Sequence, residues 1–287
     1  MNRKFRQLTG MSPGEFRHRP QPTRIAAFQF VGHLLAFGIT PVATDSMLMN
    51  NTLLLKNELD GVKVVSHNHG LEQLHDLEVD LIIAPTYFYN IPDRIKSLEK
   101  IAPVVTIEWG KMDCLEEARL FGKLLGKEQE AERWIDRYLE KVRQAKERLE
   151  GHLEPGETVA LYEIREDRIG IWDRTARGAF NLYDMLGLTP PERVQQEVLQ
   201  PGTHLFITEA ALPEYAADVM FVVYESNGSY PDLNKQVANS NVWRNLPAAR
   251  HNRIYPLKLE EFWCCDALSL ERQLDKQVDL LASGTEN

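Results

Sequence analysis

Two stretches of this sequence alternate short apolar runs with helical spacing, and one long helical stretch separates them. The apolar runs of the first stretch have the length of strands buried on both faces: residues 25–31, 41–44, 62–65, 80–85 and 104–107. Helical spacing fills the intervals, at residues 34–37, 71–77 and 93–101. Strands that alternate with helices of this length are typical of βαβ units and of a parallel sheet. We therefore predict an α/β lobe over residues 24–127.

The second stretch repeats this pattern after Glu154-Pro155-Gly156. The expected strands are residues 158–163, 168–172, 204–207, 218–223 and 253–257, and the expected helices are residues 179–186 and 267–281. The first two of these strands are close enough in the chain to pair as a hairpin. Residues 151–287 thus form the second predicted α/β lobe.

Residues 114–150 read as a helix with a break near Gly126-Lys127. In its second half, residues 128–150, apolar or small side chains recur at spacings of three and four: Ala131, Trp134, Ile135, Tyr138, Val142, Ala145 and Leu149. A helix of this length spans roughly 35 Å, which is the width of a domain. The sequence predicts two Rossmann-like α/β lobes with parallel-rich sheets, joined by this one long helix, with a ligand cleft between them. The alternative for the apolar stripe is a coiled-coil partner surface.

Composition narrows the class of protein. The chain has 287 residues, 43% of them hydrophobic, which is enough for two packed cores. No apolar run reaches the ~18 residues of a membrane span. Three cysteines (Cys114, Cys264 and Cys265) cannot build a disulfide framework, and the first residues lack the apolar stretch of a secretory signal. On these grounds we expect a cytoplasmic location.

The net charge of −9 divides into two parts. Residues 1–19 hold five basic residues against Glu15, a net charge of +4, so the remainder carries −13. A basic arm indicates either contact with nucleic acid or a solvated tail. The order Phe5-Arg6-Gln7-Leu8-Thr9-Gly10-Met11-Ser12-Pro13-Gly14-Glu15-Phe16-Arg17 resembles the end of the second helix-turn-helix of AraC-type regulators. That resemblance implies that residues 1–19 are the remnant of a DNA-binding domain preceding this chain, with a linker over residues 20–23.

Several fragments along residues 24–283 resemble a second family, in the same order. They are Leu34-Leu35-Ala36-Phe37-Gly38-Ile39-Thr40-Pro41-Val42, Leu71-Glu72 with residues 77–83, Ile101-Ala102-Pro103-Val104-Val105, Leu124-Leu125-Gly126-Lys127 and residues 242–248. They are similar to the helix-linked (class III) periplasmic-binding-protein-like domains, which carry ferric siderophores, haem or cobalamin to ABC importers. The resemblance leans to the siderophore branch.

Ligands of open α/β sheets bind beyond the carboxyl ends of the strands. A ferric catecholate is a bulky trianion with aromatic faces, so its pocket needs basic groups and flat apolar walls. The loops expected at those ends supply such residues, and the candidate ligand-binding set is His33, His67, Tyr87, Trp109, Lys111, Arg165, Trp172, Arg174, Arg177 and Trp263. The alternative for each arginine is an ordinary surface ion pair. The siderophore itself would hold the iron, so we expect no intrinsic cofactor.

Direct metal binding and catalysis have weaker support. His67 and His69 stand two residues apart, but no companion Cys or His follows at a spacing typical of a metal site. Cys264-Cys265 reads as two ordinary thiols. The sequence contains no dinucleotide or P-loop glycine motif, no nucleophile elbow and no zinc-protease motif. We expect no enzymatic activity.

These observations lead to one expectation and two alternatives. The expectation is a cytoplasmic sensor module of an AraC-family transcriptional regulator, which binds a ferric siderophore, preferably a catecholate, and reaches DNA only through the upstream helix-turn-helix domain. The first alternative is the substrate-binding protein of a ferric-siderophore, haem or cobalamin ABC importer, lipid-anchored outside the cytoplasm, whose signal lies outside this chain. The resemblance then implies an acidic permease contact on each lobe; Glu209 fits the second, and residues 89–93 offer no clear Glu for the first. The second alternative is a chelatase or reductase acting on the siderophore.

Overall fold

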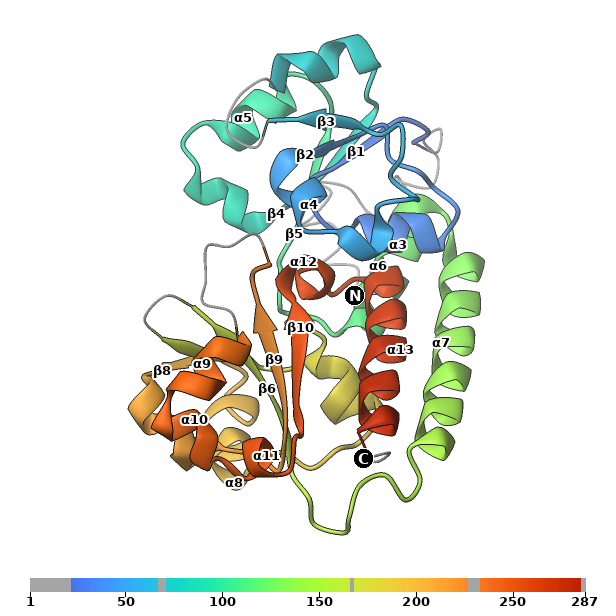
Figure 1. The fold of residues 1–287 in the computed structure, drawn as a ribbon. Helices are drawn as coiled ribbons and strands as arrows, with labels where there is room; N and C mark the ends of the chain where they lie inside the picture. The colour runs from blue at the N-terminus through green and yellow to red at the C-terminus, as the bar shows by residue number, and fades with distance from the viewer. Residues whose placement is uncertain (1–21, 67–70, 166–167, 227–232, 285–287) are drawn as a thin grey trace. The chain divides into compact units, whose positions relative to one another are not determined.

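The computed structural model describes residues 22–66, 71–165, 168–226 and 233–284. The chain folds into two units: the first runs to Arg137 and also takes in Asp266–Ser269, and the second comprises Tyr138–Cys265 and the chain from Leu270 onward. Within the described ranges each unit contains one five-stranded sheet (Figure 1). The predicted α/β class is therefore confirmed.

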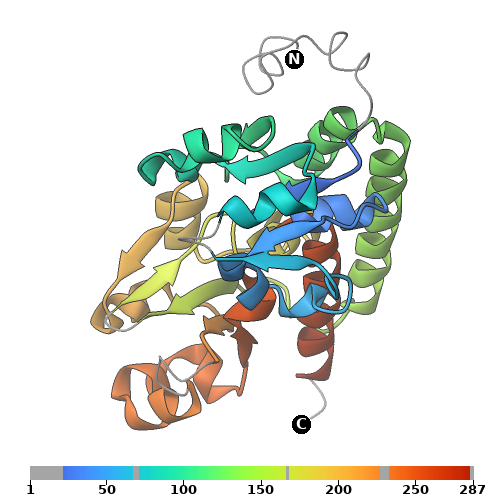
Figure 2. The ribbon, with the colours of Figure 1, turned by 90° about the horizontal axis from the view of Figure 1, so that it is seen from above.

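The first sheet, sheet A, is parallel throughout. Its strands are β1 (Ile25–Ala27), β2 (Ala43–Asp45), β3 (Lys63–Val65), β4 (Leu81–Pro85) and β5 (Val104–Ile107), in the order β3-β2-β1-β4-β5. Figure 2 shows these strands in blue to green. The chain moves outward from β1 on one side and from β4 on the other, so the strand order reverses between these two strands. Ligands of doubly wound sheets bind at the carboxyl end of such a reversal.

Helices and 3-10 turns follow the strands of the first unit along the chain. They are α3 (Val31–Ala36), α4 (Ser46–Asn50), α5 (Arg94–Glu99) and α6 (Cys114–Leu125), with 3-10 turns η1 (Leu53–Leu55), η2 (Leu71–Leu77) and η3 (Thr86–Asn90). Asp113 caps α6, because its carboxylate accepts from Glu116 N at 2.8 Å. Gly126 ends α6 in the left-handed region at φ 64°, where the sequence predicted a break.

The start of the first unit differs from the prediction. We expected a strand over residues 25–31, but β1 ends at Ala27 and Val31 already lies in α3. Phe30 adopts a left-handed conformation with φ 64°, which starts α3 almost directly after β1. The apolar run was too uniform to show where the strand ended, because buried strands and buried helix starts use the same side chains.

The second sheet, sheet B, is mixed. Its strands are β6 (Val159–Ile164), β7 (Ile169–Ile171), β8 (Leu205–Ile207), β9 (Val219–Tyr224) and β10 (Ile254–Lys258), in the order β10-β9-β6-β7-β8. Strands β6, β9 and β10 are parallel, whereas β7 pairs antiparallel with β6 and with β8. The predicted hairpin of the first two strands is confirmed.

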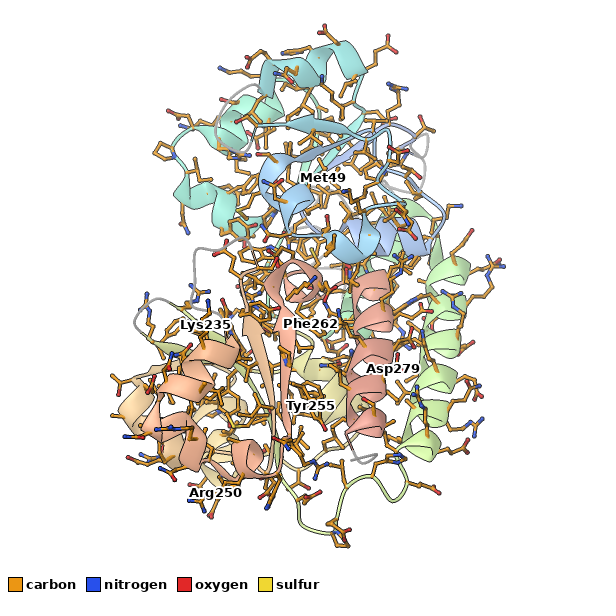
Figure 3. The ribbon with its side chains drawn as sticks, viewed as in Figure 1. Met49, Lys235, Arg250, Tyr255, Phe262 and Asp279 are labelled. Atoms are coloured by element: carbon orange, nitrogen blue, oxygen red, sulfur yellow. The ribbon has the colours of Figure 1, made fainter. Side chains whose placement is uncertain are left out.

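Helices α7 (Glu128–Arg148) and α13 (Ala267–Ser283) are the longest in the described ranges. Helix α7 begins in the first unit and continues into the second. In the second unit the two helices run side by side, and Figure 3 shows Asp279 on the side of α13 that faces α7. Lys141 Nζ lies 2.6 Å from Asp275, and Arg148 Nη1 lies 2.5 Å from Asp279. The predicted apolar stripe of α7 is buried within the chain, so it is not a coiled-coil surface.

The remaining elements of the second unit are short. They are the π-helices η4 (Asn181–Met185) and η5 (Gln195–Leu199), the 3-10 turn η6 (Glu209–Tyr215), and the helices α8 (Glu192–Val194), α9 (Leu233–Asn239), α10 (Asn241–Asn245), α11 (Pro247–Arg250) and α12 (Leu259–Phe262). Figure 3 labels Tyr255 on β10 and Phe262 at the end of α12. In the described part of the chain, none of these helices is long and apolar enough to cross a membrane.

Candidate ligand-binding site

In the first unit, three predicted site residues follow adjacent parallel strands. Tyr87 comes directly after β4, and Trp109 and Lys111 come directly after β5, so all three lie at the carboxyl edge of sheet A. Tyr87 and Trp109 are half-buried and Lys111 is exposed. Tyr89, which is outside the predicted set, lies in the same turn as Tyr87 and is 61% exposed. Its hydroxyl lies 3.5 Å from Thr106 Oγ1.

His33 lies in the core of the first unit. Its side chain is fully buried, its Nε2 is 3.2 Å from Glu117 Oε2, and its ring stacks on Phe121 with centroids 4.8 Å apart. Burial raises the pKa of the Glu117 carboxyl, and the carboxylates of Asp266 and Asp113 raise it further against the opposing effect of His33. A ligand reaches this imidazole only if the pair opens. His67 lies outside the described residues.

Arg94 is a buried cation outside the predicted site residues. Its Cζ is 4.2 Å from the ring centroid of Phe88 and 5.8 Å from that of Phe28, and its Nη2 is 3.9 Å from Asp45 Oδ2. Among the described residues, its Nε and Nη2 have no hydrogen-bond partner. Burial lowers the pKa of Arg94, and the Asp45 carboxylate opposes that shift. This cation packs against the Phe88 ring of η3, the turn that also carries Tyr87 and Tyr89.

The second unit brings two predicted arginines onto one carboxylate. Glu163, near the end of β6, accepts from Arg177 Nε at 2.9 Å through Oε2 and from Arg165 Nε at 3.1 Å through Oε1. The side chains of Glu163 and Arg177 are only 4% exposed, whereas Arg165 is 32% exposed. Hydrogen bonds between charged groups are stronger than those between neutral groups, so the Glu163 carboxylate holds both guanidinium groups in place.

Two tryptophans enclose Arg177. Its Cζ is 4.8 Å from the ring centroid of Trp172 and 4.8 Å from that of Trp263, and Arg165 Cζ is 5.7 Å from Trp172. Guanidinium groups at such distances are attracted to the faces of aromatic rings. We refer to Glu163, Arg165, Trp172, Arg177 and Trp263 as the Glu163 cluster; four of these five were predicted site residues.

Strand register explains why these residues meet. Glu163 pairs with Gly170, which pairs with Phe206, so all three positions share one face of sheet B, and Trp172 follows Gly170 on that face. Gly170 leaves room for the indole, because a Cβ there would lie 3.3 Å from Trp172 Nε1. The backbone of Arg177 has φ 57°, a left-handed conformation that is unfavourable for a residue other than glycine. Its side chain reaches back to Glu163.

One expectation about this region was wrong. We placed Trp172 at the carboxyl edge of its sheet, but β7 runs antiparallel, and Ile171 pairs with Tyr162, two residues before the end of β6. Trp172 therefore lies over the face of the sheet and is mostly buried, with its ring 4.9 Å from that of His204.

The other two predicted residues of this unit lie outside the Glu163 cluster. Arg174 is half-exposed; its Nε donates to Asp184 at 3.1 Å and its Nη1 donates to Leu199 O at 3.1 Å. Glu209 begins η6 and accepts a hydrogen bond from the Ser240 hydroxyl. Together, Glu163 and Asp184 place two carboxylates against the three predicted arginines. The described residues contain no group of three or more His, Cys, Asp or Glu arranged to hold a metal ion.

Comparison with known proteins agrees with this architecture. The family model described as "Periplasmic binding protein" matches residues 31–260. The chain is 30% identical to the iron(3+)-hydroxamate-binding protein YxeB of Bacillus subtilis (99% of this chain, 88% of YxeB) and 28% identical to the iron(3+)-hydroxamate-binding protein FhuD of the same species (89% and 79%). A solved FhuD fold-family periplasmic binding protein, a component of a Fep/Fec-like ferrichrome ABC transporter from B. subtilis, matches with a TM-score of 0.80 at 26% identity (92% and 96%).

These similarities correct two expectations. The prediction of a sensor module of an AraC-type regulator is wrong, because the relatives matching along nearly the whole chain are siderophore-binding and importer proteins. The prediction of a cytoplasmic location is wrong for the same reason, since the matched structure is a periplasmic component. Residues 1–19, which resemble an AraC-type segment, lie outside the described residues, and no comparison supports that assignment. The fold, the arrangement of its two sheets and the match over residues 31–260 lead to one conclusion: this chain belongs to the periplasmic binding protein family.

Proposed function

We propose that this chain is the substrate-binding protein of an ABC importer and carries a ferric hydroxamate siderophore. Its relatives are named for iron(3+)-hydroxamate binding, and the similar solved structure belongs to a ferrichrome transporter. This role implies a location outside the cytoplasm. The iron is cargo held by the siderophore, so the protein needs to recognise only the organic shell of the complex.

The pairing of arginines with carboxylates in the second unit carries the choice of siderophore. Three catecholates around iron(III) leave a net charge of minus three, whereas three hydroxamates leave none. A trianion would require several uncompensated cations, but Glu163 and Asp184 offset two of the three predicted arginines. This balance favours a complex with little charge, in place of the catecholate that the sequence suggested.

The aromatic residues supply the apolar contact that such a ligand needs. Trp263 is half-buried beside Arg177, and in the first unit Tyr89 is largely exposed beside the half-buried Tyr87 and Trp109. Amphipathic aromatic rings bury apolar surface while they keep a polar group for hydrogen bonding. In this role Arg174 would use its exposed N–H groups to donate to hydroxamate oxygens.

Titration of the intrinsic tryptophan fluorescence tests the proposal. Ferrichrome and ferrioxamine B, both hydroxamates, are expected to quench the fluorescence with a Kd on the order of 1 µM or lower, and ferric enterobactin and haem with a Kd at least about tenfold higher. Tight binding of haem or of the catecholate, without a response to either hydroxamate, would reject the assignment. The importer role is tested with the cognate permease in proteoliposomes, where the loaded protein should stimulate ATP hydrolysis.

A further inference from the structure

Glu163 occupies an unusual position among the charges of the second unit. Each of its carboxylate oxygens is hydrogen-bonded to a different arginine, Oε2 to Arg177 and Oε1 to Arg165. The third predicted arginine, Arg174, does not share this carboxylate, because its Nε donates to Asp184 at 3.1 Å. A single buried negative charge therefore offsets one of the two positive charges nearest the tryptophan pair.

The burial of the Glu163 carboxylate strengthens its electrostatic effect on a bound ligand. Glu163 and Arg177 are almost completely removed from solvent, and Arg177 is in contact with the rings of Trp172 and Trp263. Charges in such surroundings are screened less than charges in water, so their electric field extends past the rings of Trp172 and Trp263. A charged ligand resting against Trp263 would sense the sum of the Glu163, Arg165 and Arg177 charges.

We infer that Glu163 determines the charge selectivity of this protein: its carboxylate sets the preference for uncharged ferric hydroxamates over trianionic ferric catecholates. The inference rests on the proposed function and deepens it. The Glu163 side chain is 4% exposed and contacts both arginines, so it is a positioning residue that acts through Arg165 and Arg177. The same arginines, without the carboxylate, would form a site for an anionic complex.

The test compares two probes of similar size and different charge, ferrichrome (neutral) and ferric enterobactin (minus three). The measured quantity is the ratio of their dissociation constants for each variant. Any common effect of a substitution on folding or packing cancels in this ratio. Glu163→Gln keeps the shape of the side chain and removes its charge, and it should shift the ratio toward ferric enterobactin by about tenfold or more at low salt.

Two further variants keep the test informative if Glu163→Gln folds poorly with Arg177 left buried beside an amide. Arg165→Gln leaves the buried Glu163–Arg177 pair intact and removes one positive charge, so the ratio should move in the opposite direction, away from ferric enterobactin. The double variant Glu163→Gln/Arg177→Gln removes one charge of each sign and should return the ratio close to the wild-type value. If Glu163 had a purely structural role, the ratio of dissociation constants would not move in opposite directions in Glu163→Gln and Arg165→Gln.

The outcomes separate this inference from the proposed function. A ratio that stays constant in Glu163→Gln and Arg165→Gln, while the wild type binds ferrichrome, overturns the role of Glu163 and leaves the proposed function in place. A wild-type protein that binds neither hydroxamate overturns the proposed function and this inference with it.

Discussion

The main-chain N–H of Gly32 donates a hydrogen bond of 2.7 Å to the carboxylate of Asp266, across 234 residues of sequence. The other oxygen of this carboxylate accepts from Ser269 N at 3.3 Å, in the first turn of α13. One side chain therefore satisfies the amino ends of both α3 and α13, and the short segment Asp266–Ser269 belongs to the first unit.

Gly32→Ala should destabilise the first unit strongly. A Cβ at Gly32 would lie 1.9 Å from Asp266 Oδ1, so either α3 or the carboxylate must move and the cap is lost. We expect a loss of about 3 kcal/mol, read from the shift of the urea transition. Gly38→Ala is the control, because its Cβ would meet open space and only the cost of its left-handed backbone, about 1 kcal/mol, applies. Equal losses in both variants would contradict the steric explanation.

The pair of His33 and Glu117 predicts a dependence of stability on pH. Burial raises the pKa of Glu117 above its ordinary value of 4.5, so the folded state binds this proton more tightly than the unfolded state. The stabilisation is fully present below about pH 4.5 and is lost as the pH rises through the folded pKa. Glu117→Gln should therefore melt at a higher temperature than the wild type at pH 8 and at the same temperature near pH 4.

Thermal unfolding followed between pH 4 and pH 8 checks this prediction. Glu116→Gln is the matched control, because Glu116 lies on the exposed side of the same helix and is part of its capping box. That variant should not become more stable than the wild type at pH 8. If Glu117→Gln is less stable than the wild type at pH 8, the carboxylate stabilises the fold in its charged form and the prediction fails.

The buried amide of Asn181 predicts a second stability effect. Its Nδ2 donates to Leu270 O and to Gln277 Oε1, both at 3.0 Å, and its Oδ1 accepts from the Tyr138 hydroxyl. Asn181→Leu removes the hydrogen bonds that link this amide to the Tyr138 hydroxyl, Leu270 O and Gln277 Oε1 in a buried setting, so we expect a loss of about 3 kcal/mol in the free energy of unfolding. Asn245 is the exposed control: its Nδ2 donates to Asn241 O and its Oδ1 accepts from Arg250 Nη2, both at the surface. Asn245→Leu should change that value by less than about 0.5 kcal/mol.

Arg174 provides a direct test of ligand binding. It is half-exposed and is held by Asp184 and Leu199 O, which leaves part of its guanidinium open to a ligand. Arg174→Gln should raise the Kd for ferrichrome about tenfold, since a charged donor to a ligand oxygen is lost. Arg193→Gln is the matched control, an exposed arginine in the same unit with carboxylate partners in Glu197 and Glu214. Equal effects of both variants would remove Arg174 from the site.

Glu209 and Asp93 are candidates for contact with a permease. Asp93 is largely exposed at the start of α5, and Glu209 lies half-exposed at the start of η6. The double variant Asp93→Asn/Glu209→Gln should keep its affinity for ferrichrome and lower the stimulation of permease ATP hydrolysis about tenfold or more. Unchanged stimulation would show that the permease binds other residues. Glu99→Gln, at the end of α5, serves as the control.

Much of the fold could be predicted from the sequence because it rests on local patterns. The ten strands of the described residues fall on apolar runs that the sequence marks, and the break at Gly126 follows from the glycine itself. The short helices α8 to α12 were missed, because elements of three to seven residues have too few turns to show a period.

The candidate site was predicted less completely. Arg165, Trp172, Arg177 and Trp263 were selected by residue type and come together in the structure. The predicted set did not include Glu163 or Arg94, since nothing in their local sequence shows that a carboxylate will meet two arginines or that a cation will be buried beside aromatic rings.

The sequence by itself determined the two α/β units, the long helix and the residue types available for a siderophore, because periodicity and composition are properties of the chain. Only the tertiary structure decided that β7 pairs antiparallel with β6 and that His33 is buried in contact with Glu117. It also decided that Asp266 caps α3, 234 residues away in the sequence. Most important, it decided that Arg165 and Arg177 share the Glu163 carboxylate and that Arg174 pairs with Asp184. Charge balance and burial depend on distances between segments remote in sequence, and those distances exist only once the sheets have formed.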